Sequence, residues 1–259
     1  MFLSLLNYFR SYRFRRACFN KFLSFQNQVS ASLYGNNQIK VLSGPFRGLK
    51  YFNEVVWGLI TPRWIGSYED ILHEIFYNIA LKKGYDVILD IGAAEGYYAV
   101  GLAWLLPKAK VFAFDIDPFA RKLQAKLANL NNITNLFINA RCSYSAINRL
   151  VKKRCLIICD IEGQEFELLN PLKARNLQFC DILLETHRFN NYSENEVVDI
   201  MKKRFLASHK VSVIHDIPKD ITFYYKALEG KLAYEVLNKA VNECRSNQCW
   251  MWLEAKSLD

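Results

Sequence analysis

Short apolar runs and longer amphipathic stretches alternate along the chain. Runs of four to seven residues rich in apolar and β-branched side chains predict buried strands, and stretches with an apolar residue every three or four positions predict helices. The predicted strands are 86–91, 110–114, 136–140, 155–159, 181–184, 210–215 and 249–254. The predicted helices begin at Ser67 or cover 97–106, 119–130, 145–152, 164–169, 195–205 and 231–241. This alternation predicts an α/β fold, a doubly wound Rossmann-like sheet of about seven strands with an N-terminal helical extension.

The N-terminal segment differs from the rest. Residues 1–26 have apolar side chains at helical spacing, five basic residues and no acid, which is typical of a basic amphipathic helix. Such a helix binds an anionic membrane surface, packs on its own domain or binds a partner, and these alternatives stay open. Residues 27–65 are predicted to form a linker and a small hairpin, with a loop over 55–64, and 66–259 the α/β domain. No run of 18 apolar residues predicts a transmembrane helix.

Net charge and cysteine content indicate which binding partners and which cellular compartment to expect. Eight of the 34 basic residues precede the first acid, Glu54, so 26 basic residues accompany the 25 acidic residues in the rest of the chain. The near-neutral body argues against a domain shaped for nucleic acid. The seven cysteines include no C-x-x-C pair, which favours core residues in a reducing compartment. We expect a cytoplasmic protein, peripheral at the inner face of the membrane if the N-terminal helix binds lipid.

A glycine turn joins the first predicted strand to the next helix. Gly92 and Gly96 bracket this turn, Asp90 ends the strand before it, and Asp115 ends the second strand. Ligands of doubly wound sheets bind outside the carboxyl ends of the strands, where glycine lets the backbone approach a ligand closely. Because Asp115 follows Asp90 by 25 residues, its carboxylate is placed to accept hydrogen bonds from a ribose diol.

The residues inside the turn indicate which nucleotide ligand it would bind. A dinucleotide site requires G-x-G-x-x-G, but here Ala94 and Glu95 stand between the two glycines. The carboxylate of Glu95 would repel a pyrophosphate. It suits a ligand with positive groups, such as S-adenosylmethionine (SAM), which has a sulfonium and an ammonium. The predicted SAM contacts are Asp90, Gly92, Ala94, Glu95, Gly96, Asp115 and Asp117, with Arg141 and Cys142 beside the adenine.

Ionisable residues follow the fourth and fifth predicted strands. Alternation along an extended chain would place Asp160 and Glu162 on one side, and Glu185 and His187 together. All four would then converge near the methyl group of SAM. His187 is the expected general base for a hydroxyl acceptor, with Asp160 or Glu185 serving as base or orienting it.

Two further expectations concern the same segment. No metal is expected, since the four histidines have no recognisable ligand spacing. The alternative is that Asp160, Glu162, Glu185 and His187 bind a divalent cation that lowers the pKa of the acceptor. The glutamates at 165 and 167 have the pattern of a solvated helix face.

The motifs resemble a known family. D-I-G-A-A-E-G-Y-Y with F-D-I-D-P is similar to the first two motifs of class I SAM-dependent methyltransferases, and IICDIEGQEFELLNP with DILLETHRF resembles the FkbM type of that class. The residues that match the FkbM pattern are Asp160, Glu162, Gly163, Glu165, Glu185 and His187. The resemblance implies O-methylation of sugars or polyketide hydroxyls. The chain departs from it at Asp115, where a glutamate is common.

These observations predict a SAM-dependent O-methyltransferase, in residues 66–259, that acts on a small-molecule or saccharide acceptor. A nucleic-acid methyltransferase is one alternative, although the segment after the fourth strand lacks a proline-aromatic motif and its acids would repel phosphates. A non-catalytic SAM-binding module is another.

Overall fold

The computed structural model of the 259-residue chain describes residues 22–82, 84–152, 155–243, 245 and 248–256. The chain forms two compact units. One contains residues 1–73 and 218–245, and the other contains residues 74–217 and 246–259.

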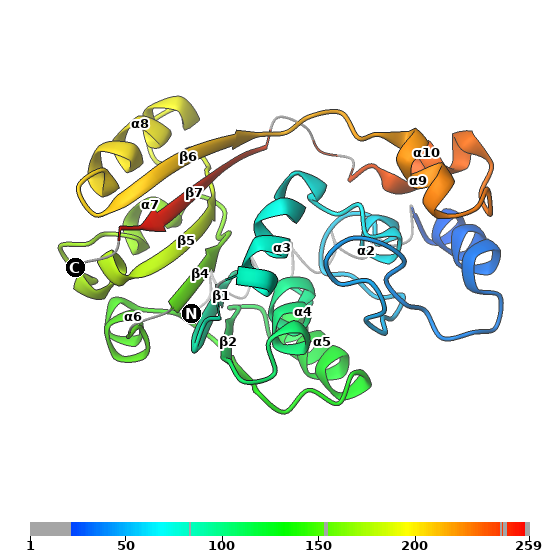
Figure 1. Cartoon of the computed structure of the whole chain (residues 1–259), viewed down its shortest axis with the longest axis horizontal. Helices are drawn as coiled ribbons and strands as arrows, with labels where there is room; N and C mark the ends of the chain where they lie inside the picture. The colour runs from blue at the N-terminus through cyan, green and yellow to red at the C-terminus, as the bar shows by residue number, and fades with distance from the viewer. Residues whose placement is uncertain (1–21, 83, 153–154, 244, 246–247, 257–259) are drawn as a thin grey trace, which may run out of the picture. The chain divides into compact units, whose positions relative to one another are not determined.

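A mixed β-sheet forms the centre of the second unit (Figure 1). Its strands are β1 (Val87–Ile91), β2 (Lys110–Phe114), β3 (Leu136–Asn139), β4 (Cys155–Cys159), β5 (Cys180–Glu185), β6 (His209–His215) and β7 (Cys249–Ala255). In the described part of the chain these seven strands lie in the order β3-β2-β1-β4-β5-β7-β6. The pairs among β1 to β5 are parallel, and β7 lies antiparallel between β5 and β6. This order is the Rossmann-like class I methyltransferase fold, which confirms the predicted fold class.

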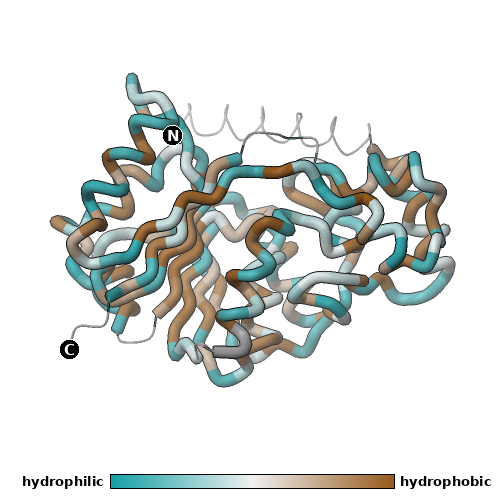
Figure 2. The backbone as a smooth tube through the Cα atoms, turned by 45° about the horizontal axis from the view of Figure 1, so that its top comes forward, coloured by the Kyte–Doolittle hydropathy of each residue, from teal (hydrophilic) through white to brown (hydrophobic). Residues whose placement is uncertain are grey.

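Helices cover both faces of this sheet. One side carries α6 (Tyr144–Leu150), α7 (Glu165–Leu168) and α8 (Glu194–Phe205), and the other carries α4 (Tyr97–Leu105) and α5 (Pro118–Leu130) (Figure 1). The central strands are buried on both faces and therefore mostly apolar, as the brown strands of Figure 2 show. The core between the sheet and α8 includes Ile157, Leu184 and Met201.

Local capping explains where several helices begin. Asp117 accepts a hydrogen bond from the backbone N–H of Phe119 at the start of α5, and Ser193 with Glu196 forms a capping box at the start of α8. These caps lie within a residue or two of the predicted boundaries. The 3-10 helix η2 (Arg175–Phe179) was not predicted, because it is shorter than the periodicity needed to identify a helix.

Within the first unit, the linker that was predicted to begin at residue 27 is helical as far as residue 34. Residues 22–34 are helical. Val29 and Tyr34 are buried while the polar side chains between them are largely exposed, so the apparently loop-like composition is one solvated face of a helix. The part of the predicted amphipathic helix at residues 1–21 lies outside the described residues, and its membrane contact stays a prediction.

Among the other elements near the first unit, the hairpin agrees with expectation and the helices differ from it. The hairpin is present as an antiparallel bridge between Lys40 and Lys50. The predicted loop over 55–64 includes the start of α2 (Thr61–Ile65), because Pro62 lies in the first turn, where proline is tolerated. Ser67 does not begin a helix. Its hydroxyl donates to the carbonyl of Val241 at 2.9 Å, and η1 (Asp70–Leu72) and α3 (His73–Lys82) follow further along the chain.

The segment 218–245, predicted to belong to the α/β domain, packs in this first unit. It contains α9 (Ile221–Ala227), which was not predicted, and α10 (Tyr234–Val241). Lys219 forms ion pairs at 2.9 Å with both Asp70 and Glu243, which ties this segment to residues near the end of the N-terminal part. Among the described helices, none is long and apolar enough to cross a membrane.

Candidate active site

The strand register brings four predicted site positions to one edge of the sheet. Ile91 of β1 pairs with Phe114 of β2 and Cys159 of β4, and Cys159 pairs with Leu184 of β5. The residues that follow are Gly92, Asp115, Asp160 and Glu185. They lie at the carboxyl ends of neighbouring parallel strands, where the sequence predicted the ligand site.

The glycine turn requires glycine at its first position. Gly92 has φ +89°, and a Cβ atom there would lie 1.7 Å from the carbonyl oxygen of Asp160. Gly96 has φ +98° and precedes α4. Ala94 also has a positive φ of 45°, and hydrogen bonds hold it in this unusual conformation: its N–H donates to Asp115 and its carbonyl accepts from Gln124.

Asp115 lies at the end of β2, as predicted. One carboxylate oxygen accepts from the N–H of Ala94 at 2.9 Å and the other from the N–H of Asp117 at 2.8 Å. The carboxylate is therefore fixed in position. A carboxylate has about four lone-pair sites and can accept from hydroxyl donors as well as from backbone N–H groups.

The other predicted SAM contacts have varied environments. Asp90 and Glu95 are buried, with 2% and 0% of their surface exposed. Asp117 caps α5. Of the pair after β3, Arg141 is exposed, and burial raises the pKa of the Cys142 thiol to about 12.

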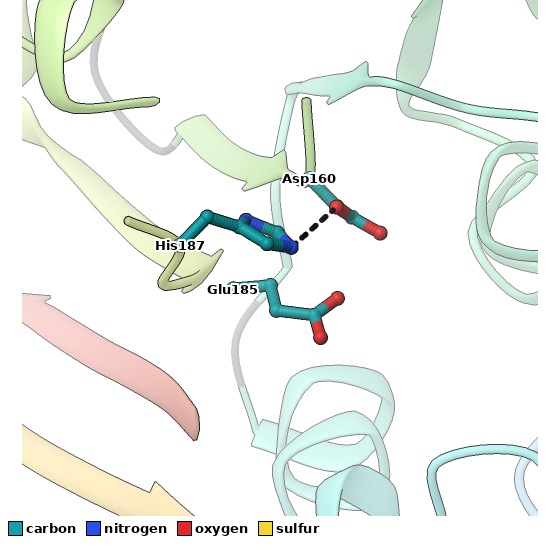
Figure 3. Close-up of side chains that lie close together, drawn as sticks. All are labelled: Asp160, Glu185 and His187. Carbon is teal, nitrogen blue, oxygen red and sulfur yellow. Dashed lines mark ion pairs between the residues drawn. The ribbon is translucent and has the colours of Figure 1, made fainter. Parts of the chain in front are cut away.

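The ends of β4 and β5 bring together Asp160, Glu185 and His187 (Figure 3). One potential ligand atom from each residue lies within 4.8 Å of the other two. The Nε2 atom of His187 is 3.9 Å from Oδ1 of Asp160 and 3.6 Å from Oε2 of Glu162. The predicted convergence of these residues is therefore present.

The path of the chain after β4 differs from the extended alternation that was predicted. Glu162 and Gly163 have φ values of +55° and +101°, so the chain turns sharply there. The Glu162 side chain is 87% exposed, at the rim of the cluster. This turn, rather than strand alternation, places Glu162 beside His187.

Glu165 is the residue of this cluster whose environment pattern reasoning misjudged. Its side chain is 3% exposed, whereas that of Glu167 is 46% exposed, so the solvated-face prediction is wrong for Glu165. Its carboxylate accepts from the N–H groups of Ile161 at 2.6 Å and Gly163 at 2.9 Å, and lies 3.1 Å from Nδ1 of His187. The D-x-E-G-x-E spacing is the sequence feature that could have predicted this, because the turn at Gly163 directs Glu165, in the first turn of α7, back toward these N–H groups.

The surroundings of His187 change its expected protonation. Burial lowers its pKa, but the hydrogen bond to Glu165 and the charges of Glu165, Asp160 and Glu185 outweigh burial and raise the pKa to about 9. With these three carboxylates beside it, the imidazole carries a proton at neutral pH, which disfavours His187 as the general base. Gln248, which no motif pointed to, donates to Oε1 of Glu185 at 2.8 Å and fixes that carboxylate.

Comparison with known proteins gives the following similarities. No family model matches the chain, so the FkbM resemblance stays a prediction. A 97-residue stretch is 36% identical to the release factor glutamine methyltransferase of Flavobacterium psychrophilum, which covers 37% of this chain and 29% of that protein. The chain thus matches less than a third of that relative's length.

Similar solved structures are distant in sequence. An rRNA methylase from Streptococcus thermophilus has 12% identity and a TM-score of 0.47 over 72% of this chain and 96% of that one. The O-methyltransferase TomG from Streptomyces achromogenes, in complex with SAM, has 9% identity and a TM-score of 0.49 over 70% and 77%. An O-methyltransferase from Bacillus cereus, in complex with S-adenosylhomocysteine (SAH), has 11% identity and a TM-score of 0.48 over 69% and 77%. The assignment to the class I methyltransferase fold rests on the strand order described above.

Proposed function

We propose that the protein is a SAM-dependent methyltransferase that methylates a hydroxyl of a sugar, a glycan or a related small molecule. One observation carries this proposal. The cluster of Asp160, Glu185 and His187 lies at the same edge of the sheet as the glycine turn and Asp115. A nucleotide-binding turn beside a proton-transfer cluster is the arrangement that methylation of a hydroxyl needs.

The turn fits SAM better than a dinucleotide. Gly92 allows close approach of a ligand, and Asp115 is held at the end of β2 for a ribose. Ala94 occupies the position at which a dinucleotide site has its second glycine, and Glu95 adds an acid where a pyrophosphate would sit. The 97-residue similarity to a methyltransferase supports methyl transfer without indicating the acceptor.

The residues of the cluster can manage the proton of a hydroxyl acceptor. SAM, when bound, would supply a methyl carbon on a sulfonium, so that the acceptor oxygen would form a C–O bond as the C–S bond breaks and its electron pair stays on sulfur. The hydroxyl proton passes to Asp160, whose side chain is 27% exposed and therefore accessible to an acceptor. Glu185 is buried and accepts a hydrogen bond from Gln248, so its proposed role is to hold His187 and the acceptor in position rather than to take the proton.

The acceptor class follows from the chemistry of this edge. The carboxylates at 160, 162 and 185 repel phosphate groups, which disfavours nucleic acid. Carboxylates readily accept hydrogen bonds from the hydroxyls of a sugar. The resemblance of the strand-end motifs to FkbM-type enzymes supports the same class.

Labelled SAM tests the proposal. The purified chain is incubated with methyl-tritiated SAM and separate panels of saccharides, polyketide alcohols, RNA and peptides. We expect label in a hydroxyl compound, and a kcat reduced about 10²–10⁴-fold in Asp160→Asn. Asp199→Asn is the matched control because Asp199 is 68% exposed on α8. Label only in RNA or peptide, or equal rates in the two variants, would contradict the proposal.

A further inference from the structure

The cluster at the ends of β4 and β5 has the dimensions of a cation site. Asp160, Glu185 and His187 each offer one ligand atom, and these atoms lie within 4.8 Å of one another. Cations of the Mg²⁺ and Mn²⁺ size bind nitrogen and oxygen ligands at about 2.0–2.2 Å, so one ion contacts ligand atoms up to about 4.4 Å apart. Side-chain movements of under about 1 Å would bring these three atoms to that spacing.

The orientation of the imidazole supports the same interpretation. Nδ1 of His187 lies 3.1 Å from the buried carboxylate of Glu165, which two backbone N–H groups hold in place. The opposite nitrogen, Nε2, therefore faces Asp160 and the rim at Glu162. Histidines that bind metals usually have the other ring nitrogen hydrogen-bonded to a carboxylate or a carbonyl group. This second feature is independent of the spacing of the three ligand atoms.

Charge gives a third argument. Four carboxylates, at positions 160, 162, 165 and 185, lie around one imidazole. A divalent cation bound at Nε2 would add two positive charges to this acidic cluster. Carboxylates suit Mg²⁺ and Mn²⁺, and imidazole suits transition-metal dications, so two carboxylates with one imidazole form a donor set that fits Mn²⁺ better than Mg²⁺.

We propose that Asp160, Glu185 and Nε2 of His187 bind one divalent cation, with Glu165 as the positioning residue of His187. The role of the ion rests on the proposed function: it would polarise the acceptor hydroxyl and lower its pKa. The partly exposed side chain of Asp160 gives an acceptor access to the ion.

Binding of Mn²⁺ alone to the full chain tests the site. Free Mn²⁺ is followed by electron paramagnetic resonance during titration, and Mg²⁺ is then added as a competitor. We expect one Mn²⁺ per chain, displaced by Mg²⁺, with an affinity at least tenfold weaker in Asp160→Asn, Glu185→Gln and His187→Gln. Glu165→Gln is expected to weaken binding about 10–100-fold through the orientation of His187. Glu167→Gln, two residues away on the same helix, should bind as the native chain does.

The outcomes separate this site from the proposed function. Far-UV circular dichroism confirms that each variant is folded, and SAH binding is measured on the same samples. No Mn²⁺ binding by the native chain, or equal affinity in all folded variants, overturns the cation site even where SAH binds. Stoichiometric Mn²⁺ binding lost in the three ligand variants supports the site, whether or not SAH binds, while failure of SAH binding counts against the methyltransferase proposal alone.

Discussion

Glu165 should stabilise the fold far more than its neighbour Glu167, and one isosteric change at each position tests this. One carboxylate oxygen of Glu165 accepts from Ile161 at 2.6 Å and lies near His187, while the other accepts from Gly163 at 2.9 Å. In Glu165→Gln, the amide has one acceptor oxygen, so a backbone N–H faces its NH₂ group in either orientation. Losing one charge-assisted hydrogen bond in a buried site costs about 1.5–3 kcal/mol.

Thermal unfolding measures the difference. A cost of about 2 kcal/mol lowers Tm by about 4–8 °C in a chain of this size. Glu167→Gln is the control, because that side chain is half exposed and pairs with the half-exposed Lys173 and with Tyr144. Its Tm should stay within about 1 °C of the native value. Equal melting temperatures for the two variants would refute the anchoring role of Glu165.

Two further predictions follow from the glycine turn and from a buried histidine. Gly92→Ala should abolish SAH binding or soluble expression, because its Cβ would lie 1.7 Å from the carbonyl oxygen of Asp160. Gly35→Ala is the control and should bind SAH normally, because nothing lies within 4 Å of the added Cβ. Native-like SAH binding by Gly92→Ala would show that the turn is misplaced. Burial lowers the pKa of His73 to about 4, so between pH 6.5 and 4 this histidine binds a proton in the unfolded chain but not in the folded one, and the free energy of unfolding should fall by about 3 kcal/mol over that range. In urea unfolding, the free energy of unfolding of His73→Gln should depend less steeply on pH than that of the native chain. Equal pH dependence in the two proteins would contradict the lowered pKa of His73.

Particular residues show what the sequence could predict. Asp115, Asp160 and Glu185 were located correctly because each follows an apolar run, and the carboxyl ends of parallel strands meet at one edge. The strand-end positions depended only on local pattern and a general topological rule.

Other features depended on conformations that the pattern does not encode. Glu165 points inward because Glu162 and Gly163 adopt positive φ angles, and a simple period of two or 3.6 residues does not describe such a turn. Gln248 reaches Glu185 only because β7 pairs antiparallel with β5 from 63 residues away. Residues 22–26 are helical as predicted, but the continuation of this helix over 27–34 was predicted to be a linker because polar residues outnumber its buried positions.

Calorimetric titration of the purified chain with SAH tests the central claim most directly. The account predicts micromolar binding by the native chain and by Asp199→Ala, and binding at least tenfold weaker in Asp115→Ala, since that variant loses the charged acceptor for the ribose. Absence of binding by the native chain, or equal affinity in Asp115→Ala and Asp199→Ala, would contradict it.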